Sequence, residues 1–449
     1  MVRRIAALAV LVFLVLATTQ AFAHPGAPVQ IVTSPGGIVA WLVEDHSNPL
    51  VSLSLGFRGG GAADPVGKEG LAEFASGLMD EGAGEIDAKA FQQRLADLAV
   101  DFSFDAGADN FVGRMRTLSE NRDAGFDLLR LALTAPRFDA PAVERIRGQL
   151  LARLADDASN ADALADRLWW RLAFPEHPYG RPLSGTETSL KSITPDDLKA
   201  FARRRFARDN LVLAVVGDIS AKDLAPLLDL TFGALPATAE PVTVADVAPV
   251  AGGEVVVAER EVPQSVILFG QAGLKREDPD FYAAYLVNHV LGGGGFGSRL
   301  TTEVREKRGL AYSIDTSLAA LDHVGLVQGS AGTQNARAAE TLDLIRGEWA
   351  RMGTQGPTEK ELADAKTYVI GSFALRFDSS LGIARLLVGL QLDGFGPDYL
   401  ANRKGYFDSV TLADAKRVAK RLLDPTKLVV VVVGKPDGIA ATRPAPSLD

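Results

Sequence analysis

The stretch SITPDDLKAFARRRFARDNLVLAVVG, residues 192–217, recurs in the chain as SVTLADAKRVAKRLLDPTKLVVVVVG, residues 409–434. Ser192 aligns with Ser409 and Gly217 with Gly434, so the offset is 217 residues at both ends and the alignment has no gap. Each stretch reads as a capped helix followed by an apolar strand that ends in glycine. A gapless match over two such elements indicates an internal duplication.

The repeat extends to other parts of the chain. Asp64-Pro65 matches Asp278-Pro279 at an offset of 214 residues. Residues 127–130 match residues 343–346 at an offset of 216. Residues 235–253 lie between the copies, are rich in proline, alanine and glycine, and lack a helical pattern, which is typical of a linker. We therefore expect an N-terminal domain, a linker and a homologous C-terminal domain, at residues 24–236, 237–253 and 254–449.

The first 23 residues predict export. Arg3 and Arg4 precede an apolar run over residues 5–17, and Ala21-Phe22-Ala23 forms a small-x-small cleavage site. The apolar run is too short for a membrane-spanning helix. We expect a signal peptide that is removed after Ala23, a periplasmic location, and no membrane anchor after cleavage.

Composition excludes several classes of protein. The chain has no cysteine, which rules out disulfides, thiolate metal sites and a cysteine nucleophile. The net charge is −9 and becomes −11 without Arg3 and Arg4, and there is no long basic run, so no nucleic-acid partner is expected. The sequence also lacks G-x-S-x-G, S-x-x-K and the P-loop motif, which leaves the common serine hydrolases and P-loop enzymes without support.

The order of the predicted elements favours an α+β fold. In the first copy we expect a hairpin over residues 30–43 and strands at 51–57, near Phe102, near Val112 and at 211–216. Helical patterns cover residues 67–79, 87–98, 122–134, 140–156 and 161–172. The second copy repeats this order, with helices that follow Asp278, Ala336, Thr358 and Thr411. Because strands and helices do not alternate strictly, each domain is predicted to hold an antiparallel-rich sheet backed by helices.

Two motif types are weaker than they look. No two of the five histidines stand four residues apart, so a histidine-rich zinc site within this chain is not expected. Residues 292–297, GGGGFG, satisfy G-x-G-x-x-G, but a helical pattern and not a strand precedes them. A helix end with a flexible turn is the favoured interpretation. The backbone amides of Gly293 and Gly294 remain candidates for contact with a peptide.

A longer block in the second copy carries a resemblance to a known family. Leu291-Gly292-Gly293, Ser298-Arg299-Leu300 and then VREKRGLAYS at residues 304–313 resemble the second-domain signature of the pitrilysin, or insulinase, family of zinc peptidases. His177-Pro178-Tyr179-Gly180 and the duplicated layout are similar to that family too. The resemblance implies paired α+β domains that form half of a clamshell chamber around peptides.

The same resemblance shows that the catalytic motif of the family has been lost here. The family places H-x-x-E-H on the first helix of the first domain. At the matching positions this chain has Glu73 and Gly77 in place of the histidines, and Ser76 in place of the glutamate. On a later helix, Ile146 replaces a supporting glutamate and Arg153 replaces the third zinc ligand. Since a guanidinium cannot be deprotonated to ligate and repels a dication, we predict no metal in this domain and an ordinary Glu73–Arg153 ion pair.

The second domain keeps residues that the resemblance links to catalysis. Arg305 and Tyr312 match an arginine and a tyrosine that reach toward the zinc site in the family, and Arg308 is the alternative for the arginine role. A tyrosine hydroxyl can donate to the developing oxyanion, and an arginine can hold the substrate backbone. The plainer interpretation is that Arg305 forms a surface ion pair at a helix end and that Tyr312 packs in a strand.

We therefore expect a noncatalytic subunit of a heterodimeric zinc endopeptidase. A homologous partner would supply H-x-x-E-H and the zinc, and this chain would bind no cofactor and contribute Arg305 and Tyr312. The peptide substrate would add a strand to an open sheet edge, for which residues 51–59 are the candidate. Two alternatives stay open: a structural or peptide-binding protein without a role in catalysis, such as a homodimer, and a chain that hydrolyses peptides alone.

Overall fold

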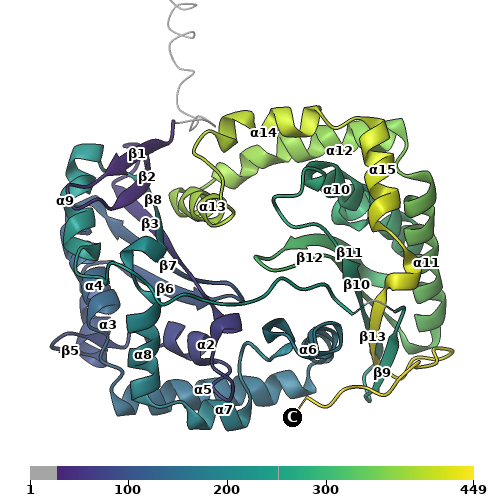
Figure 1. Cartoon of the computed structure of the whole chain (residues 1–449), viewed down its shortest axis with the longest axis horizontal. Coiled ribbons are helices and arrows are strands. Elements are labelled where there is room, and N and C mark those ends of the chain that lie inside the picture. Colours follow the sequence, from purple (N-terminus) through teal and green to yellow (C-terminus); the bar gives the residue numbers. More distant parts are fainter. Residues whose placement is uncertain (1–27, 251, 449) are drawn as a thin grey trace, which may run out of the picture.

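Two β-sheets stand on opposite sides of the molecule, with helices around and between them (Figure 1). The computed structural model describes residues 28–250 and 252–448. The predicted signal peptide, residues 1–23, lies outside the described residues. Among the residues described, no helix combines the length and the apolar character needed to cross a bilayer.

The first sheet has six strands in the order β1-β2-β8-β3-β7-β6. Its neighbours run antiparallel except for β2 and β8, which are parallel. The strands are β1 (Gln30–Thr33), β2 (Val39–Glu44), β3 (Leu50–Arg58), β6 (Asp101–Ala106), β7 (Asn110–Leu118) and β8 (Leu211–Gly217). A separate two-stranded ribbon joins β4 (Gly82–Ala83) to β5 (Ile86–Asp87).

The second sheet repeats this topology. Its five strands follow the order β9-β13-β10-β12-β11, which corresponds to β2-β8-β3-β7-β6, and its β9 and β13 are again the parallel pair. The strands are β9 (Val255–Glu259), β10 (Gln264–Ala272), β11 (Ala311–Ala320), β12 (Gly325–Gln334) and β13 (Val429–Gly434). The predicted α+β class, with an antiparallel-rich sheet in each half, is confirmed.

Helices follow in the same order in the two halves. The first half has α2 (Leu71–Ser76), α3 (Ala88–Asp97), α4 (Arg122–Thr134), α5 (Ala140–Ser159), α6 (Ala161–Ala173), α7 (Glu187–Ser192), α8 (Pro195–Arg205) and α9 (Ala221–Phe232). The second half has α10 (Phe281–Asn288), α11 (Ala338–Gln355), α12 (Glu359–Gly371), α13 (Ser380–Leu392), α14 (Tyr399–Asp408) and α15 (Leu412–Leu422). Short π-helical turns at His289–Gly293 and Thr301–Glu306 interrupt the second half.

The repeated stretch folds alike in both copies for local reasons. The N-cap hydroxyl of Thr194 accepts a hydrogen bond from the Asp197 amide at the start of α8, and Thr411 does the same for Asp414 in α15. In each case the aspartate side chain bonds back to the cap residue, which completes a capping box. The strand that follows, β8 or β13, lies between two neighbours in its sheet.

Each half covers its partner's sheet with one helix. Helix α6 packs on β10 and β13 of the second sheet, and α13 packs on β3 and β8 of the first (Figure 1). Alternate residues of β13 therefore enter different cores, with Val430 and Val432 in the core of their own half and Val431 against α6. This burial on both faces explains why β13 is an unbroken valine run.

Glycines in the two central strands make room for these exchanged helices. A Cβ at Gly270 of β10 would lie 2.7 Å from Trp169 Cζ2 of α6. A Cβ at Gly56 of β3 would lie 3.2 Å from side-chain atoms of Val388 and Leu392, which belong to α13. The two glycines occupy equivalent positions of the repeat, at an offset of 214 residues, so the crossing is itself duplicated.

The halves also meet through two hairpin turns and the linker. The Asp109 carboxylate, at the β6–β7 turn, accepts hydrogen bonds from the Tyr179 hydroxyl at 2.7 Å and from the Asp322 amide at 3.0 Å, at the β11–β12 turn. Residues 237–250 form no helix or strand, yet the Val247 amide donates to His323 of the second half and the Val250 amide donates to Ala173 of the first. This segment is therefore fastened to both halves.

One expectation about the sheet edges is wrong. Residues 51–59 were the candidate open edge, but β3 pairs with β7 on one side and with β8 on the other. Its backbone donors and acceptors are consumed by these two ladders, so no peptide can add a strand there. The outer strands are β1 and β6 in the first sheet, and β9 and β11 in the second.

Candidate functional site

The position that carries the zinc motif in the resembling family lies on α2 and α5. Helix α2 is shorter than the predicted 67–79, because Gly67 and Gly70 adopt φ angles of +81° and +88° and place a turn before it. Glu73 Oε1 of α2 lies 3.0 Å from Arg153 Nη1 of α5, which confirms the predicted ion pair. Burial raises the pKa of Glu73, and the nearby Arg153 guanidinium partly offsets that rise.

The remaining side chains at this position do not fit zinc. A Cβ at Gly77 would lie 3.2 Å from Ile146 Cγ2, so Ile146 fills the space beside the residue that replaces a histidine. The Ser76 hydroxyl donates to the Glu73 carbonyl and is thus tied to its own helix. One carboxylate paired to a guanidinium, next to a serine and an isoleucine, is no donor set for this metal. In the described part of the chain, no cluster of three metal-binding side chains occurs.

Arg305 and Tyr312 lie together in the second half, in a stack with a third residue. The Arg305 guanidinium carbon is 5.2 Å from the centre of the Tyr312 ring and 4.7 Å from the centre of the Phe296 ring. Both rings are exposed, Tyr312 at 78% and Phe296 at 66%. Tyr312 stands at a break in register of β11, where Ala311 pairs with Thr333 and Ser313 pairs with Gly332. Such a bulge re-aims a side chain and here leaves Tyr312 outside the core.

The plainer interpretation of this pair does not match the geometry. Arg305 makes no ion pair and no side-chain hydrogen bond to any described residue, and Tyr312 projects into solvent instead of packing in its sheet. The Arg305 guanidinium thus keeps its N–H donors available while the two rings restrict its position. A free, oriented guanidinium beside an exposed phenol can bind carbonyl or carboxylate oxygens of a ligand.

Arg308, the alternative for the arginine role, is already engaged. Its Nη1 lies 2.8 Å from Glu303 Oε2 and also donates to the Glu303 carbonyl at 2.7 Å. Hydrogen bonds from Lys307 first, and from Arg308 next, lower the pKa of Glu303 to about 2. The geometry therefore favours Arg305 over Arg308 for contact with a ligand.

The glycine run forms a tight turn below this stack. A Cβ at Gly293 would lie 2.7 Å from Asn288 Nδ2, and a Cβ at Gly294 would lie 2.7 Å from the His289 carbonyl. Gly293 is exposed and Gly294 half-buried, so their backbone stays near the surface. Packing of the π-turn explains the glycines without a ligand. Sequence reasoning missed Phe296, the one apolar residue in the run, whose place among glycines was the available signal.

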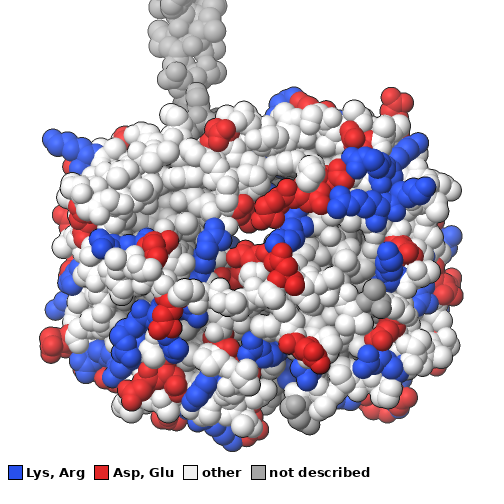
Figure 2. All heavy atoms as spheres, viewed as in Figure 1, with Lys and Arg blue, Asp and Glu red and all other residues white. Residues whose placement is uncertain are grey.

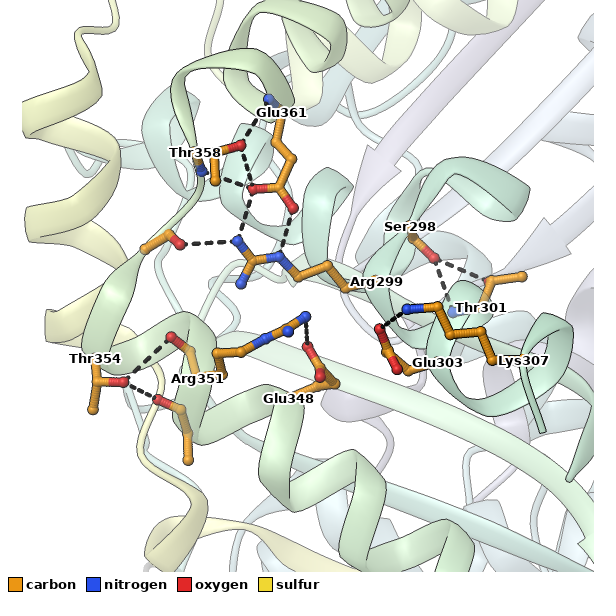
Figure 3. Close-up of polar contacts among 12 residues, drawn as sticks. Ser298, Arg299, Thr301, Glu303, Lys307, Glu348, Arg351, Thr354, Thr358 and Glu361 are labelled. Atoms are coloured by element: carbon orange, nitrogen blue, oxygen red, sulfur yellow. Dashed lines mark hydrogen bonds and ion pairs between the residues drawn. The ribbon is translucent and has the colours of Figure 1, made fainter.

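A buried ion pair anchors the segment that carries Arg305 (Figure 3). The Arg299 guanidinium makes two 2.7 Å hydrogen bonds to Glu361 and a third, of 3.0 Å, to the Gly356 carbonyl. Glu361 also caps α12 by accepting from Thr358. Burial alone would raise the pKa of Glu361, but the hydrogen bonds from Arg299 and Thr358 outweigh it and lower the pKa to about 2. Arg299 thereby ties the Arg305 segment to the loop before α12.

Arg299→Ala is expected to lower the free energy of unfolding by about 2–3 kcal/mol at pH 7, because it leaves the half-buried Glu361 carboxylate without its partner. The folded pKa of Glu361, about 2, lies below the ordinary value of 4.5. Its contribution is therefore present above about pH 4.5 and is lost as the pH falls toward 2. Denaturant unfolding at pH 7, 5 and 3 should show a smaller acid-induced loss in the variant than in the native chain.

The matched control for this prediction is Arg337→Ala, at an exposed Arg337–Glu340 pair with an N–O distance of 3.0 Å. Surface pairs of this kind contribute under about 1 kcal/mol. An equal effect of the two substitutions, or an unchanged pH slope in Arg299→Ala, would contradict the anchoring role.

The two candidate sites are separate within the chain. The cavity beside Glu73 and Arg153 is lined by neither Arg305 nor Tyr312. The chain thus brings Arg305 and Tyr312 together, and Glu73 and Arg153 together, but it does not join the two pairs in one cavity. A reaction that needs both positions requires a second chain.

Comparison with known proteins gives consistent results. Residues 192–369 match the family described as the peptidase M16 inactive domain. The non-peptidase homolog YmxG of Helicobacter pylori is 30% identical over 342 residues, which cover 74% of this chain and 77% of that protein. The mitochondrial-processing peptidase subunit beta of Lentinula edodes is 22% identical over 423 residues, or 90% of each chain. A crystal structure of a peptidase M16 inactive domain from Pseudomonas fluorescens has a TM-score of 0.85 and 30% identity, over 93% of this chain and all of that one.

Proposed function

The chain belongs to the M16 peptidase family, here called the pitrilysin or insulinase family, as an inactive member, and we propose that it is the zinc-less subunit of a heterodimeric zinc endopeptidase. The observation that carries the proposal is the Arg305–Tyr312 pair, exposed and free of intramolecular polar partners among the described residues. A folded chain gains little stability from such a pair at its surface. A ligand from outside the chain gives both groups a purpose.

The chemistry of the pair suits peptide hydrolysis on a neighbouring chain. When water attacks a peptide carbonyl, negative charge develops on the carbonyl oxygen. The Tyr312 hydroxyl can donate a hydrogen bond to that oxygen, and the Arg305 guanidinium can hold an adjacent backbone carbonyl of the peptide. Donors that are already oriented stabilise developing charge without first reorganising.

The partner would carry the metal. Glu73, Ser76, Gly77 and Arg153 do not fit zinc, so the water-activating centre is assigned to a homologous chain with an intact H-x-x-E-H motif. The relationship to a subunit of a processing peptidase supports a partnership of two unequal M16 chains. The substrates we propose are unfolded peptides, and the open edges of β6 or β11 could pair with them.

The test combines this chain with a secreted H-x-x-E-H homologue from the same genome. Each chain alone and the mixture are assayed on a quenched fluorescent unstructured peptide, and the metal content of each is determined. We expect one equivalent of zinc in the homologue, none in this chain, and hydrolysis only by the mixture. Equal hydrolysis by the homologue alone would refute the proposal, as would zinc-dependent hydrolysis by this chain alone.

A second candidate function is peptide binding without catalysis, which the name of the Helicobacter pylori relative as a non-peptidase favours. It predicts that labelled unstructured peptides bind to this chain with the same affinity whether or not any homologue is present. In that case the mixture would show no more hydrolysis than the homologue alone.

Phe296→Ala is expected to weaken the site without removing either functional group. Arg305 would keep one aromatic contact and lose the other, so its guanidinium would be less restricted. We expect KM of the heterodimer to rise by about threefold to tenfold with a small change in kcat, since a cation–π contact contributes about 0.5–2 kcal/mol. Phe296→Tyr keeps the ring and serves as the control. A variant that loses kcat and keeps KM would contradict this role.

We also propose that the assembly works in the periplasm, on the basis of the sequence of residues 1–23. Fractionation of cells that express the full chain, with mass determination of its N-terminus, is expected to find a periplasmic protein that begins at His24. A cytoplasmic chain that retains residue 1 would contradict this location.

A further inference from the structure

The cavity beside Glu73 and Arg153 has about 840 Å³ of volume and contacts residues from both ends of the chain. Its walls combine polar and apolar groups: the Glu73–Arg153 ion pair, the rings of Trp170 and Tyr179, and Leu154 from α5. Ser447 and Leu448, the final described residues, line it as well. A volume of this size is in the range of small-ligand and peptide side-chain pockets.

The chain reaches this cavity by leaving its own half. After β13, Thr442 exchanges backbone-directed hydrogen bonds with Val255, and Arg443 pairs with Glu254 at 3.0 Å. These contacts tie residues up to 443 to the second half. The following residues, Pro-Ala-Pro-Ser-Leu at 444–448, cross to the first half, and the end of the described chain lies near α6 (Figure 1). We call residues 444–448 the crossing segment.

The crossing segment is held at the cavity by few contacts. The Leu448 carbonyl accepts a hydrogen bond from Arg167 Nη2 of α6 at 3.4 Å, and the Leu448 side chain packs, half-buried, against the apolar cluster that includes Trp169 and Phe174. The Nε of Arg167 is buried and has no hydrogen-bond partner among the described residues. An unsatisfied buried donor costs about 1–3 kcal/mol, which an additional acceptor from a ligand would recover.

This arrangement resembles a peptide in its binding site. An extended, proline-containing segment lays one aliphatic side chain on an apolar surface and gives one backbone carbonyl to an arginine. The two prolines limit the freedom of the segment in the released state, so little entropy is lost when it docks. The surface charges around it are mixed in sign (Figure 2), so binding does not depend on a strongly charged ligand.

We propose that this cavity is a peptide-binding site for short extended segments with an aliphatic side chain, and that the crossing segment is its resident intramolecular occupant. A peptide enters only when the crossing segment leaves, so the segment regulates access by competition. The site is distinct from the Arg305–Tyr312 stack and does not rest on the proposed function.

The test uses a fluorescein-labelled peptide with the sequence of residues 441–448, ATRPAPSL, and measures its anisotropy with the native chain and with a chain that ends after Arg443. A tethered occupant has an effective concentration near the millimolar range. The shortened chain is therefore expected to bind the probe at least about tenfold more tightly than the native chain. A scrambled peptide of the same composition is the negative control.

Two substitutions show whether binding occurs at this cavity. Arg167→Ala in the shortened chain removes both the used and the unused donor, and should weaken probe binding at least fivefold. Arg337→Ala, at the exposed pair with Glu340, should leave it unchanged. Leu448→Asp in the full chain detaches the segment without shortening the chain, and should raise probe affinity as the truncation does. Circular dichroism before each titration verifies that the variants are folded.

Equal binding of the probe to the native and shortened chains would overturn the competitive role of the segment. Absence of binding to the folded shortened chain, or binding that is insensitive to Arg167→Ala, would overturn the site itself. Neither the partner nor any peptidase activity enters this experiment. Its failure would therefore leave the proposed catalytic partnership standing, and failure of the partnership would leave this site standing.

Discussion

Tyr312→Phe is expected to lower kcat of the assembled heterodimer by about 10²–10³-fold with little change in KM. The phenyl ring keeps the stack with Arg305, whose guanidinium carbon lies 5.2 Å from the ring centre, so only the hydroxyl is lost. Removal of one donor to the oxyanion has an effect of this size in other acyl-transfer enzymes. The measurement is steady-state hydrolysis of an unstructured peptide by the reconstituted pair, with kcat and KM determined separately.

Arg305→Ala is expected to act differently. The guanidinium contacts the peptide backbone in the ground state as well as in the transition state, so its loss should raise KM in addition to lowering kcat. Arg305→Lys keeps the charge but loses the planar fork, and should recover only part of the activity. A variant pair in which Tyr312→Phe changes KM alone would assign the hydroxyl to binding.

Matched controls separate these roles from general surface effects. Tyr368→Phe changes another exposed tyrosine, which is 60% exposed on α12, and should leave kcat unchanged. Arg308→Ala removes an arginine that already pairs with Glu303, and should also leave hydrolysis near its native rate. If Arg308→Ala is more damaging than Arg305→Ala, the alternative assignment of the arginine role is correct. If all four variants are active, this chain takes no part in catalysis.

The fold was predictable because the repeated stretch is governed by local rules. Thr194 and Thr411 cap their helices through contacts within four residues, and apolar runs of strand length follow. Such signals survive in sequence, and the duplication let each copy verify the other. The Glu73–Arg153 pair was predictable for a similar reason, since the loss of both zinc ligands left complementary charges at facing positions.

The exchange of α6 and α13 could not be predicted in the same way. The apolar stripe of α6 indicates that the helix is buried, but it carries no information on which sheet receives it. The space left by Gly270 for Trp169 is a contact between residues 101 positions apart and leaves no local pattern. The error about residues 51–59 has the same origin, because an alternating strand looks alike at an edge and in the centre of a sheet.

Arg305 illustrates the limit on the side of function. Spacing placed it and Tyr312 seven residues apart, but whether their side chains meet depends on the bulge in β11 and on the turn before it. Phe296 completes the stack from the glycine run, and no periodicity pointed to it. The Arg299–Glu361 pair joins residues 62 positions apart, so its anchoring role appears only in three dimensions.

Trp169→Ala is expected to lower the free energy of unfolding by about 3–5 kcal/mol, the largest effect on stability of any substitution considered. Trp169 is fully buried between α6 and the second sheet, so its removal opens a large cavity between the two halves. The indole Nε1 also donates to the Val429 carbonyl at 3.1 Å, and that bond is lost. Denaturant unfolding followed by circular dichroism gives the change in free energy.

The neighbour Trp170 gives the matched control, because it has the same volume and is only half-buried. Trp170→Ala should cost less than half as much, since part of its ring already faces solvent and less contact is lost. The location of the effect discriminates further. If α6 holds the halves together, Trp169→Ala should raise hydrogen exchange at the amides of β13, although the substitution lies in the other half of the chain. Unchanged exchange in β13, with a loss of stability confined to α5 and α6, would mean that the exchanged helix decorates the second sheet without stabilising it.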